Sequence, residues 1–168
     1  MTDCAYCKVA KDSSRAIYED DLCYAMLVSK PANPGHVVLL PKEHAPILEA
    51  VPKKTLAHLW VVANKLSVSL FDGLQAQGSN VVVHNGVVAG QSHAHALMHI
   101  LPRTQGDGLD FQWAPKQVSP EQLTAIANQL SQEIPVVGTT SAAPEESNST
   151  DDVDSGEDYL TRAVSRLP

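Results

Sequence analysis

Residues 84–103, H-N-G-V-V-A-G-Q-S-H-A-H-A-L-M-H-I-L-P-R, carry the strongest pattern in the chain. Four of the seven histidines of the protein fall in this stretch, at positions 84, 93, 95 and 99. The alternation over residues 93–101 predicts a β-strand, on which His93, His95, Leu97 and His99 share one face. A polar, half-exposed strand face is the plain alternative. Three imidazoles on one face favour a metal or anion site over that alternative.

Further strands are predicted on both sides of a long helix. Short runs of β-forming residues at 16–19, 22–27, 36–40 and 80–84 are separated by turn sequences such as P-A-N-P-G at 31–35 and N-G at 85–86. Apolar residues at three- and four-residue spacing predict a helix from Pro52 to about Gln75. The order of these elements predicts an α+β fold with a mainly antiparallel sheet.

A second helix is predicted from the S-P-E-Q sequence at 119–122. Ser119 is a suitable N-cap, Pro120 suits the first helical position, and Gln122 completes a capping box. Pro135 ends this helix. Its expected buried side consists of Leu123, Ile126, Ala127 and Leu130.

Composition places most of the charge outside the predicted domain. The 168 residues are 43% hydrophobic and carry a formal net charge of -7, and seven of the 19 acidic residues lie within 145–158. We therefore predict a folded domain over 1–137 and a disordered, acidic, Ser/Thr-rich tail over 138–168, whose last ten residues partly recover a helical spacing. The chain has no basic stripe, no apolar run of the ~18 residues that a span needs and no secretory signal. A cytoplasmic protein without nucleic-acid or membrane partners is expected.

The cysteines leave two interpretations open. Cys4 and Cys7 form a C-x-x-C pair, which occurs both in metal sites and in thioredoxin-like redox pairs. The βαβ context of the redox proteins does not follow, which favours a metal. Cys23 is expected to be a core thiol. His36 and His58 are assigned to structural roles.

Taken together, these motifs resemble the histidine triad (HIT) family of nucleotide hydrolases and transferases. The resemblance rests on the G-Q that leads into alternating histidines, on P-K-E-H at 41–44, on C-A-Y-C at 4–7, and on G-D-G followed by Trp113. It covers about residues 1–134. It implies a five-stranded antiparallel sheet with a long crossing helix and a C-terminal helix, and a homodimer. Phe111 and Trp113 are expected at the edge of the dimer or pocket, or in the core.

The family pattern places its first triad histidine at His95 and its third at His99. The central position, where the family has its nucleophilic histidine, is therefore Leu97. A leucine has no lone pair and cannot attack phosphorus, so the covalent mechanism is expected to be lost. His93 is expected to lie about 13 Å along the strand from Leu97, too far to replace it.

Two more positions depart from the family pattern, at the ribose and at the phosphate. The aspartate that the family uses on the ribose falls at Val28, and the asparagine that contacts phosphate falls at His84. The resemblance leaves a nucleotide or anion site composed of His84, Gly90, Gln91, Ser92 and His99. In this site the backbone N–H groups of the G-Q-S segment and the Ser92 hydroxyl would hold an anion.

The metal ligands of the family's zinc-binding members are all present. They correspond to Cys4, Cys7, His44 and His95, a set that suits tetrahedral Zn²⁺. The expected function is that of a divergent HIT-domain protein with structural zinc, weak binding of a purine nucleotide or another small anion, and no covalent hydrolase activity. The alternative is an active hydrolase or transferase of AMP-type or dinucleotide substrates, with His99 or His84 as its acid–base group.

Overall fold

The computed structural model describes residues 4–133. The chain divides into two units, the first ending at Leu109 and the second beginning at Asp110. In the first unit, five strands form one antiparallel sheet in the order β1-β2-β3-β5-β4. These strands are β1 (Ala16–Glu19), β2 (Cys23–Leu27), β3 (Val37–Pro41), β4 (Gly78–Val82) and β5 (Met98–Arg103). The predicted α+β class and antiparallel sheet are confirmed.

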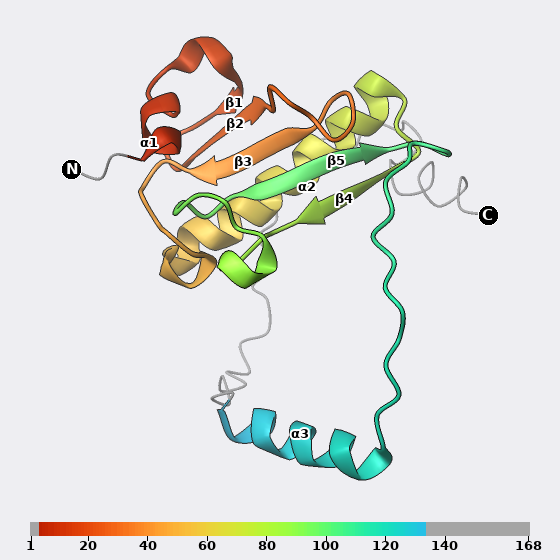
Figure 1. The fold of residues 1–168 in the computed structure, drawn as a ribbon. Helices are drawn as coiled ribbons and strands as arrows, with labels where there is room; N and C mark the ends of the chain where they lie inside the picture. The colour runs from red at the N-terminus through yellow and green to blue at the C-terminus, as the bar shows by residue number, and fades with distance from the viewer. Residues whose placement is uncertain (1–3, 134–168) are drawn as a thin grey trace, which may run out of the picture. The chain divides into compact units, whose positions relative to one another are not determined.

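Helix α2 (Lys53–Leu74) crosses one face of this sheet (Figure 1). Its apolar side packs on alternate strand residues to form the main core, which includes Leu59, Val62, Leu39, Met98 and Ile100. Pro52 is the N-cap and Gln75 ends the helix in the left-handed conformation, so the predicted bounds are confirmed. None of the described helices has the length and apolar character needed to cross a membrane.

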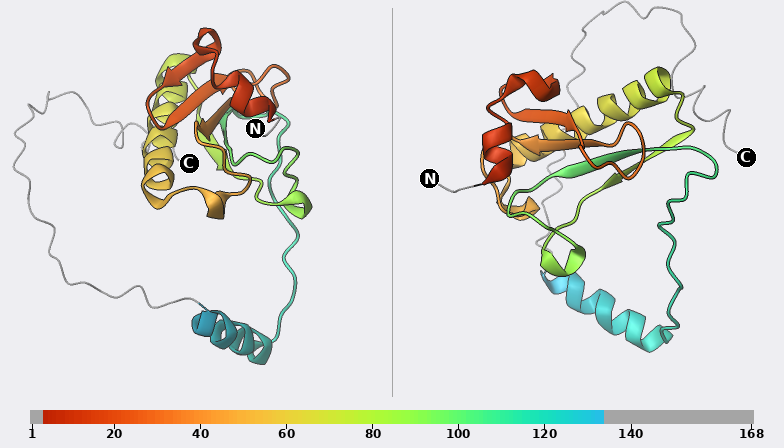
Figure 2. Two further views of the ribbon diagram at one scale, coloured as in Figure 1. Left: turned by 90° about the vertical axis from the view of Figure 1, so that its left-hand side faces the viewer. Right: turned by 45° about the horizontal axis from the view of Figure 1, so that its top comes forward.

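The opposite face of the sheet is covered by the N-terminal segment. Helix α1 (Ala5–Val9) lies on the side of the sheet away from α2 (Figure 2). Tyr6 and Val9 pack there against a second cluster that contains Tyr24, Val38 and Leu40. The apolar residues of β2 and β3 thus serve both faces, because successive strand residues point to opposite sides.

The prediction of a strand over 93–101 is wrong for its first residues. Residues 93–95 form a bend and β5 starts only at Met98. The His95 amide donates to the His93 carbonyl (2.8 Å), and the Ala96 amide donates to the Ala45 carbonyl (2.6 Å). Because these N–H groups bond to a turn and to a distant loop, they cannot extend a strand ladder. His93, His95, Leu97 and His99 therefore do not share one strand face.

The next strand is also displaced from its prediction. β4 runs from Gly78 to Val82, where the sequence pattern predicts 80–84. His84 consequently lies in the loop after the strand rather than within it.

The described part of the second unit contains helix α3 (Pro120–Glu133), which begins as predicted. The Gln122 amide donates to Ser119 Oγ, and the Ser119 amide donates to Gln122 Oε1, which is the predicted capping box. Within the second unit, Leu123, Ile126 and Leu130 of its expected buried side are each at least 50% exposed, and their packing against the first unit stays a prediction. Phe111 and Trp113 are also exposed within this unit. The predicted tail over 138–168 lies outside the described residues.

Candidate metal centre and anion pocket

Four predicted metal ligands converge beside helix α1. Cys4 precedes this helix and Cys7 lies within it, whereas His44 follows β3 and His95 lies in the bend before β5. Their ligand atoms all lie within 4.8 Å of one another, and His95 is fully buried. Residues distant in sequence thus form one Cys₂His₂ group that could hold a metal ion.

The distances within this group fit tetrahedral zinc. The Sγ atom of Cys4 lies 3.4 Å from His95 Nδ1, and Cys7 Sγ lies 3.3 Å from His44 Nδ1 and 3.6 Å from His95 Nδ1. Tetrahedral bonds to zinc of ordinary length separate sulfur from nitrogen by about 3.5 Å. The donor atoms are therefore spaced as a zinc ion requires.

The protonation of His95 also suits a metal ligand. Its Nε2–H donates to the Pro41 carbonyl over 3.0 Å. In the neutral ring this leaves the Nδ1 lone pair directed at the two thiols, because only one ring nitrogen carries a proton. Burial lowers the pKa of His95, which favours this neutral form.

Burial has the opposite consequence for the thiol of Cys7. It raises the pKa of Cys7, and the neighbouring Cys4 raises it further. Two adjacent thiolates are costly without a cation to hold them. A divalent metal would supply the missing positive charge.

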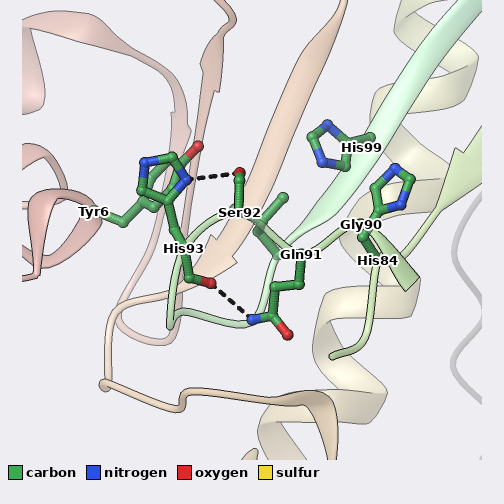
Figure 3. A pocket seen from close by; sticks show the side chains of 8 residues that line it. Tyr6, His84, Gly90, Gln91, Ser92, His93 and His99 are labelled. Carbon is green, nitrogen blue, oxygen red and sulfur yellow. Dashed lines mark hydrogen bonds between the residues drawn. The ribbon is translucent and has the colours of Figure 1, made fainter. Parts of the chain in front are cut away.

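A small pocket lies beside this group. It has a volume of about 30 Å³, and its lining consists of Tyr6, His84, Gly90, Gln91, Ser92, His93, Leu97 and His99. Such a volume holds about two water molecules or part of one oxyanion. Figure 3 shows His93 and Tyr6 on one side of Ser92, and His84 and His99 on the other. All five predicted nucleotide-binding residues line this pocket.

Three imidazoles form a chain along one side of the pocket. His36 Nε2 lies 2.9 Å from His99 Nδ1, and the ring of His84 packs edge-on against His99 with centroids 5.3 Å apart. Burial, together with the nearby His36 and His84, lowers the pKa of His99 to about 4. His99 is therefore neutral at pH 7. His36, assigned from sequence to a turn, is in fact the hydrogen-bonding partner of this pocket residue.

Main-chain amides of the G-Q segment are already hydrogen-bonded. Gly90 N–H donates to the Val87 carbonyl and Gln91 N–H donates to the Gly86 carbonyl. The Gln91 side chain holds the loop, since its Nε2 donates to the carbonyls of Pro46 and His93. The expected cradle of Gly90 and Gln91 N–H groups is thus absent in this conformation. Among the side chains that line the pocket, the Ser92 hydroxyl can donate a hydrogen bond to an anion.

His93 is not remote from the Leu97 position. Both residues line the same pocket, because the bend at 93–95 replaces the extended strand on which the 13 Å separation was based. The sequence prediction that His93 is too far away is wrong. Only the path of the loop could have revealed this proximity.

Comparison with known proteins identifies the fold family. The model of the HIT domain matches residues 10–106 of this chain. The chain belongs to the HIT domain family. The match begins after Cys4 and Cys7, so it contains His44 and His95 but not the cysteine pair.

Named relatives of this HIT-domain chain include enzymes that act on nucleotides. An adenylylsulfatase of Arabidopsis thaliana is 32% identical over 120 residues, which cover 70% of this chain and 59% of that protein. An adenosine 5'-monophosphoramidase of Schizosaccharomyces pombe is 28% identical over 134 residues, which cover 78% of this chain and 98% of that protein. The HIT-domain chain thus spans less than two thirds of the Arabidopsis relative.

Solved HIT structures share the fold. A HIT family protein of Bacillus subtilis has a TM-score of 0.73 at 27% identity, covering 80% of this chain and 99% of that one. A zinc-bound histidine triad protein of Mycobacterium smegmatis has a TM-score of 0.60 at 30% identity, covering 79% and 98%. These neighbours confirm the fold predicted from the resemblance.

Val28 and Leu97, which the sequence resemblance places at two positions of the family's site, both join the apolar cluster beneath α1. They are partly buried and pack against the group that contains Tyr24 and Met26. Neither side chain offers a hydrogen bond to a ligand. Leu97 contributes an apolar side chain to the lining of the pocket.

A second group with metal-ligand chemistry lies on the α2 side of the HIT fold. Asp20, Cys23 and His58 bring a carboxylate, a thiol and an imidazole together. Asp20 Oδ2 accepts from Tyr18 OH (2.8 Å) and bonds His58 Nε2 (2.6 Å). Its Oδ1 accepts the amides of Leu22 and Cys23. The carboxylate is satisfied by these bonds, and Cys23 is buried as predicted.

Proposed function

We propose that this HIT-domain protein binds a nucleotide phosphate or another small anion in the pocket around Ser92 and has lost covalent nucleotidyl hydrolysis. The observation that carries the proposal is that Leu97 lines the pocket, because the sequence resemblance assigns this position to the family's nucleophile. A leucine cannot form a covalent phosphorus intermediate. The neighbouring Ser92, His84 and His99 can still contact phosphate oxygens.

The remaining imidazoles are poorly suited to replace that nucleophile. His99 Nδ1 faces His36, and burial and the two neighbouring imidazoles lower the pKa of His99 to about 4. His84 Nδ1 donates to the Ala89 carbonyl at 2.7 Å. One nitrogen of each ring is thus engaged within the protein, which supports a binding role.

Loss of polar contacts supports weak nucleotide affinity. Val28 takes the place of the family's ribose acceptor and packs against apolar neighbours. Leaving ribose hydroxyls unpaired in a dry pocket costs on the order of 1–3 kcal/mol each. A purine nucleotide held mainly through its phosphate fits these residues better than one held through its sugar.

An active enzyme is the second candidate. The names of the Arabidopsis and Schizosaccharomyces relatives, which describe hydrolysis of adenosine phosphosulfate and phosphoramidate linkages, favour it. In that case water is the attacking group, and His99 or His84 exchanges the proton. The reaction class would be hydrolysis or transfer on AMP-type or dinucleotide substrates.

Cleavage assays separate the two candidates. We expect the wild type to bind AMP in calorimetry but not to cleave AMP phosphoramidate or a diadenosine polyphosphate. Leu97→His is expected to gain cleavage, because it restores a nitrogen lone pair to a surviving pocket. Sustained turnover by the wild type would establish the enzyme instead. If neither protein binds AMP, the proposal of a nucleotide site is wrong.

We further propose that Cys4, Cys7, His44 and His95 hold a structural Zn²⁺. The zinc-bound Mycobacterium neighbour and the donor distances given above support this choice of metal. All four ligand positions are filled by protein atoms, so the ion would stabilise the fold rather than activate water. The resemblance to the HIT family also suggests a homodimer, and sedimentation at micromolar concentration measures the oligomeric state.

A further inference from the structure

We propose that His93, acting with Tyr6, is a positioning residue that directs the Ser92 hydroxyl proton to a bound oxyanion. This inference rests on the anion-binding function proposed above. His93 is not one of the triad positions, and no comparison assigns it a role. It would act on phosphate binding through Ser92 and not by contacting the phosphate itself.

The geometry joins His93 directly to Ser92. His93 Nδ1 lies 2.9 Å from Ser92 Oγ, a hydrogen bond drawn in Figure 3. Both side chains are exposed and line the pocket. The imidazole would therefore affect a bound ligand indirectly, through its hydrogen bond with the serine hydroxyl.

The chemistry of an anion selects one direction for this bond. A serine hydroxyl has a single proton but can also accept hydrogen bonds. A phosphate oxyanion only accepts, so Ser92 must donate its proton to the ligand. His93 then donates Nδ1–H to the Ser92 Oγ lone pair. Two aligned donors polarise each other and strengthen the contact with the anion.

Tyr6 holds the imidazole in this position. The Tyr6 and His93 rings meet edge to face with centroids 5.1 Å apart. Tyr6 lies in α1 between the metal-binding candidates Cys4 and Cys7, so its backbone is tied to that group. An exposed histidine would otherwise sample several rotamers and lose entropy on binding.

Several donors of the G-Q segment are already bonded within the protein. The main-chain amides of Gly90 and Gln91 bond to carbonyls, and the Gln91 amide group bonds to Pro46 and His93. The orientation of the Ser92 hydroxyl therefore has a large share in phosphate affinity. Substitution of a residue that sets this orientation should therefore change the measured affinity for phosphate.

A double-mutant cycle tests the proposal by calorimetry with AMP. The variants are Ser92→Ala, His93→Phe and the double variant; Phe keeps the ring beside Tyr6 but has no N–H. Loss of a hydrogen bond to a charged group makes the expected decrease for Ser92→Ala roughly tenfold or more. His93→Phe should weaken AMP binding about threefold in the wild-type background and have no effect once Ser92 is absent.

Three controls separate positioning from general damage. Adenosine, which lacks the phosphate, should bind all variants equally. His93→Asn, whose amide retains an N–H donor, should recover part of the lost AMP affinity. Tyr6→Phe keeps the edge contact and should bind AMP as the wild type does, whereas Tyr6→Ala should weaken it. Thermal melting confirms that each variant is folded.

Several outcomes would overturn the proposal. Equal losses from His93→Phe in both backgrounds would show that His93 acts independently of Ser92. If His93→Phe loses no AMP affinity in either background, or loses as much affinity for adenosine, then His93 does not support a contact with phosphate. If the wild type does not bind AMP, the proposed nucleotide function fails, and the same cycle is measured with inorganic phosphate. Failure of phosphate to bind would then overturn the positioning role too.

Discussion

Gly90 shows how a single missing side chain shapes the pocket. Its φ is +90°, a conformation that residues with a Cβ rarely adopt. A Cβ added there would lie 3.2 Å from His84 Nδ1. The glycine thus allows both the turn and the close approach of the His84 imidazole, which donates to the neighbouring Ala89 carbonyl.

We predict that Gly90→Ala reduces AMP affinity severalfold, because the new methyl group displaces His84. Backbone strain should also lower the free energy of unfolding by about 1 kcal/mol. Gly106→Ala is the matched control, since Gly106 has φ +77° with no atom within 4 Å of an added Cβ. It should share the stability loss, measured by urea denaturation, and leave AMP binding unchanged. Equal AMP affinities for the two variants would contradict the prediction.

At the scale of elements, Asp20 and His58 join the β1–β2 turn to helix α2. Burial raises the pKa of Asp20, but hydrogen bonds from His58, Tyr18 and the Cys23 and Leu22 amides outweigh it and hold that pKa below its usual range. His58, for which the sequence suggested no partner, thus has one 38 positions away. The pairing fixes the beginning of the helix above the sheet.

We predict that Asp20→Asn lowers the free energy of unfolding by about 2 kcal/mol at neutral pH, because it removes charged hydrogen bonds. A carboxyl with a depressed folded-state pKa stabilises the protein above its unfolded pKa of about 3.9 and loses that contribution as pH falls through the folded value. The variant should therefore lose less stability than the wild type between neutral pH and acid. The exposed neighbour substitution Asp21→Asn serves as control in the same pH series of melts. If the stability of wild type and Asp20→Asn falls in parallel with pH, the Asp20 carboxyl does not contribute to the pH dependence of stability.

At the scale of the whole molecule, the Cys₂His₂ group joins the ends of the first unit. It connects α1 to the loop after β3 and to the bend before β5, from residue 4 to residue 95. A metal bound there would cross-link α1 to these two segments, which the Ala96–Ala45 and His95–Pro41 hydrogen bonds already join to each other. Its binding free energy would add to the stability of the folded chain.

We predict one zinc per chain in the purified protein, and a marked fall in melting temperature on strong chelation. Cys4→Ser should lose the metal and melt like the chelated wild type. Cys23→Ala lies outside the group and should keep its zinc, although its own cavity lowers stability. Metal analysis by mass spectrometry and scanning calorimetry measure both effects. Full zinc content in Cys4→Ser would show that the ligand set is wrong.

Periodicity and turn chemistry were sufficient to locate most elements. The α2 bounds, the capping box of α3 and β1 agree with the structure, because short-range spacing and local hydrogen bonds decide them. The resemblance to the HIT family, and not residue types alone, selected the four metal-binding candidates. Helix α1 was not predicted, since its five residues carry too little periodic signal.

The arrangement of the pocket depended on contacts that no local pattern contains. The Ala96–Ala45 hydrogen bond interrupts the predicted strand and bends His93 into the pocket beside Leu97. The His36–His99 contact joins residues 63 positions apart. Such contacts depend on the folded path of several segments at once. Local residue pattern therefore determined the elements and the kinds of side chain available, whereas tertiary hydrogen bonding decided which of them meet.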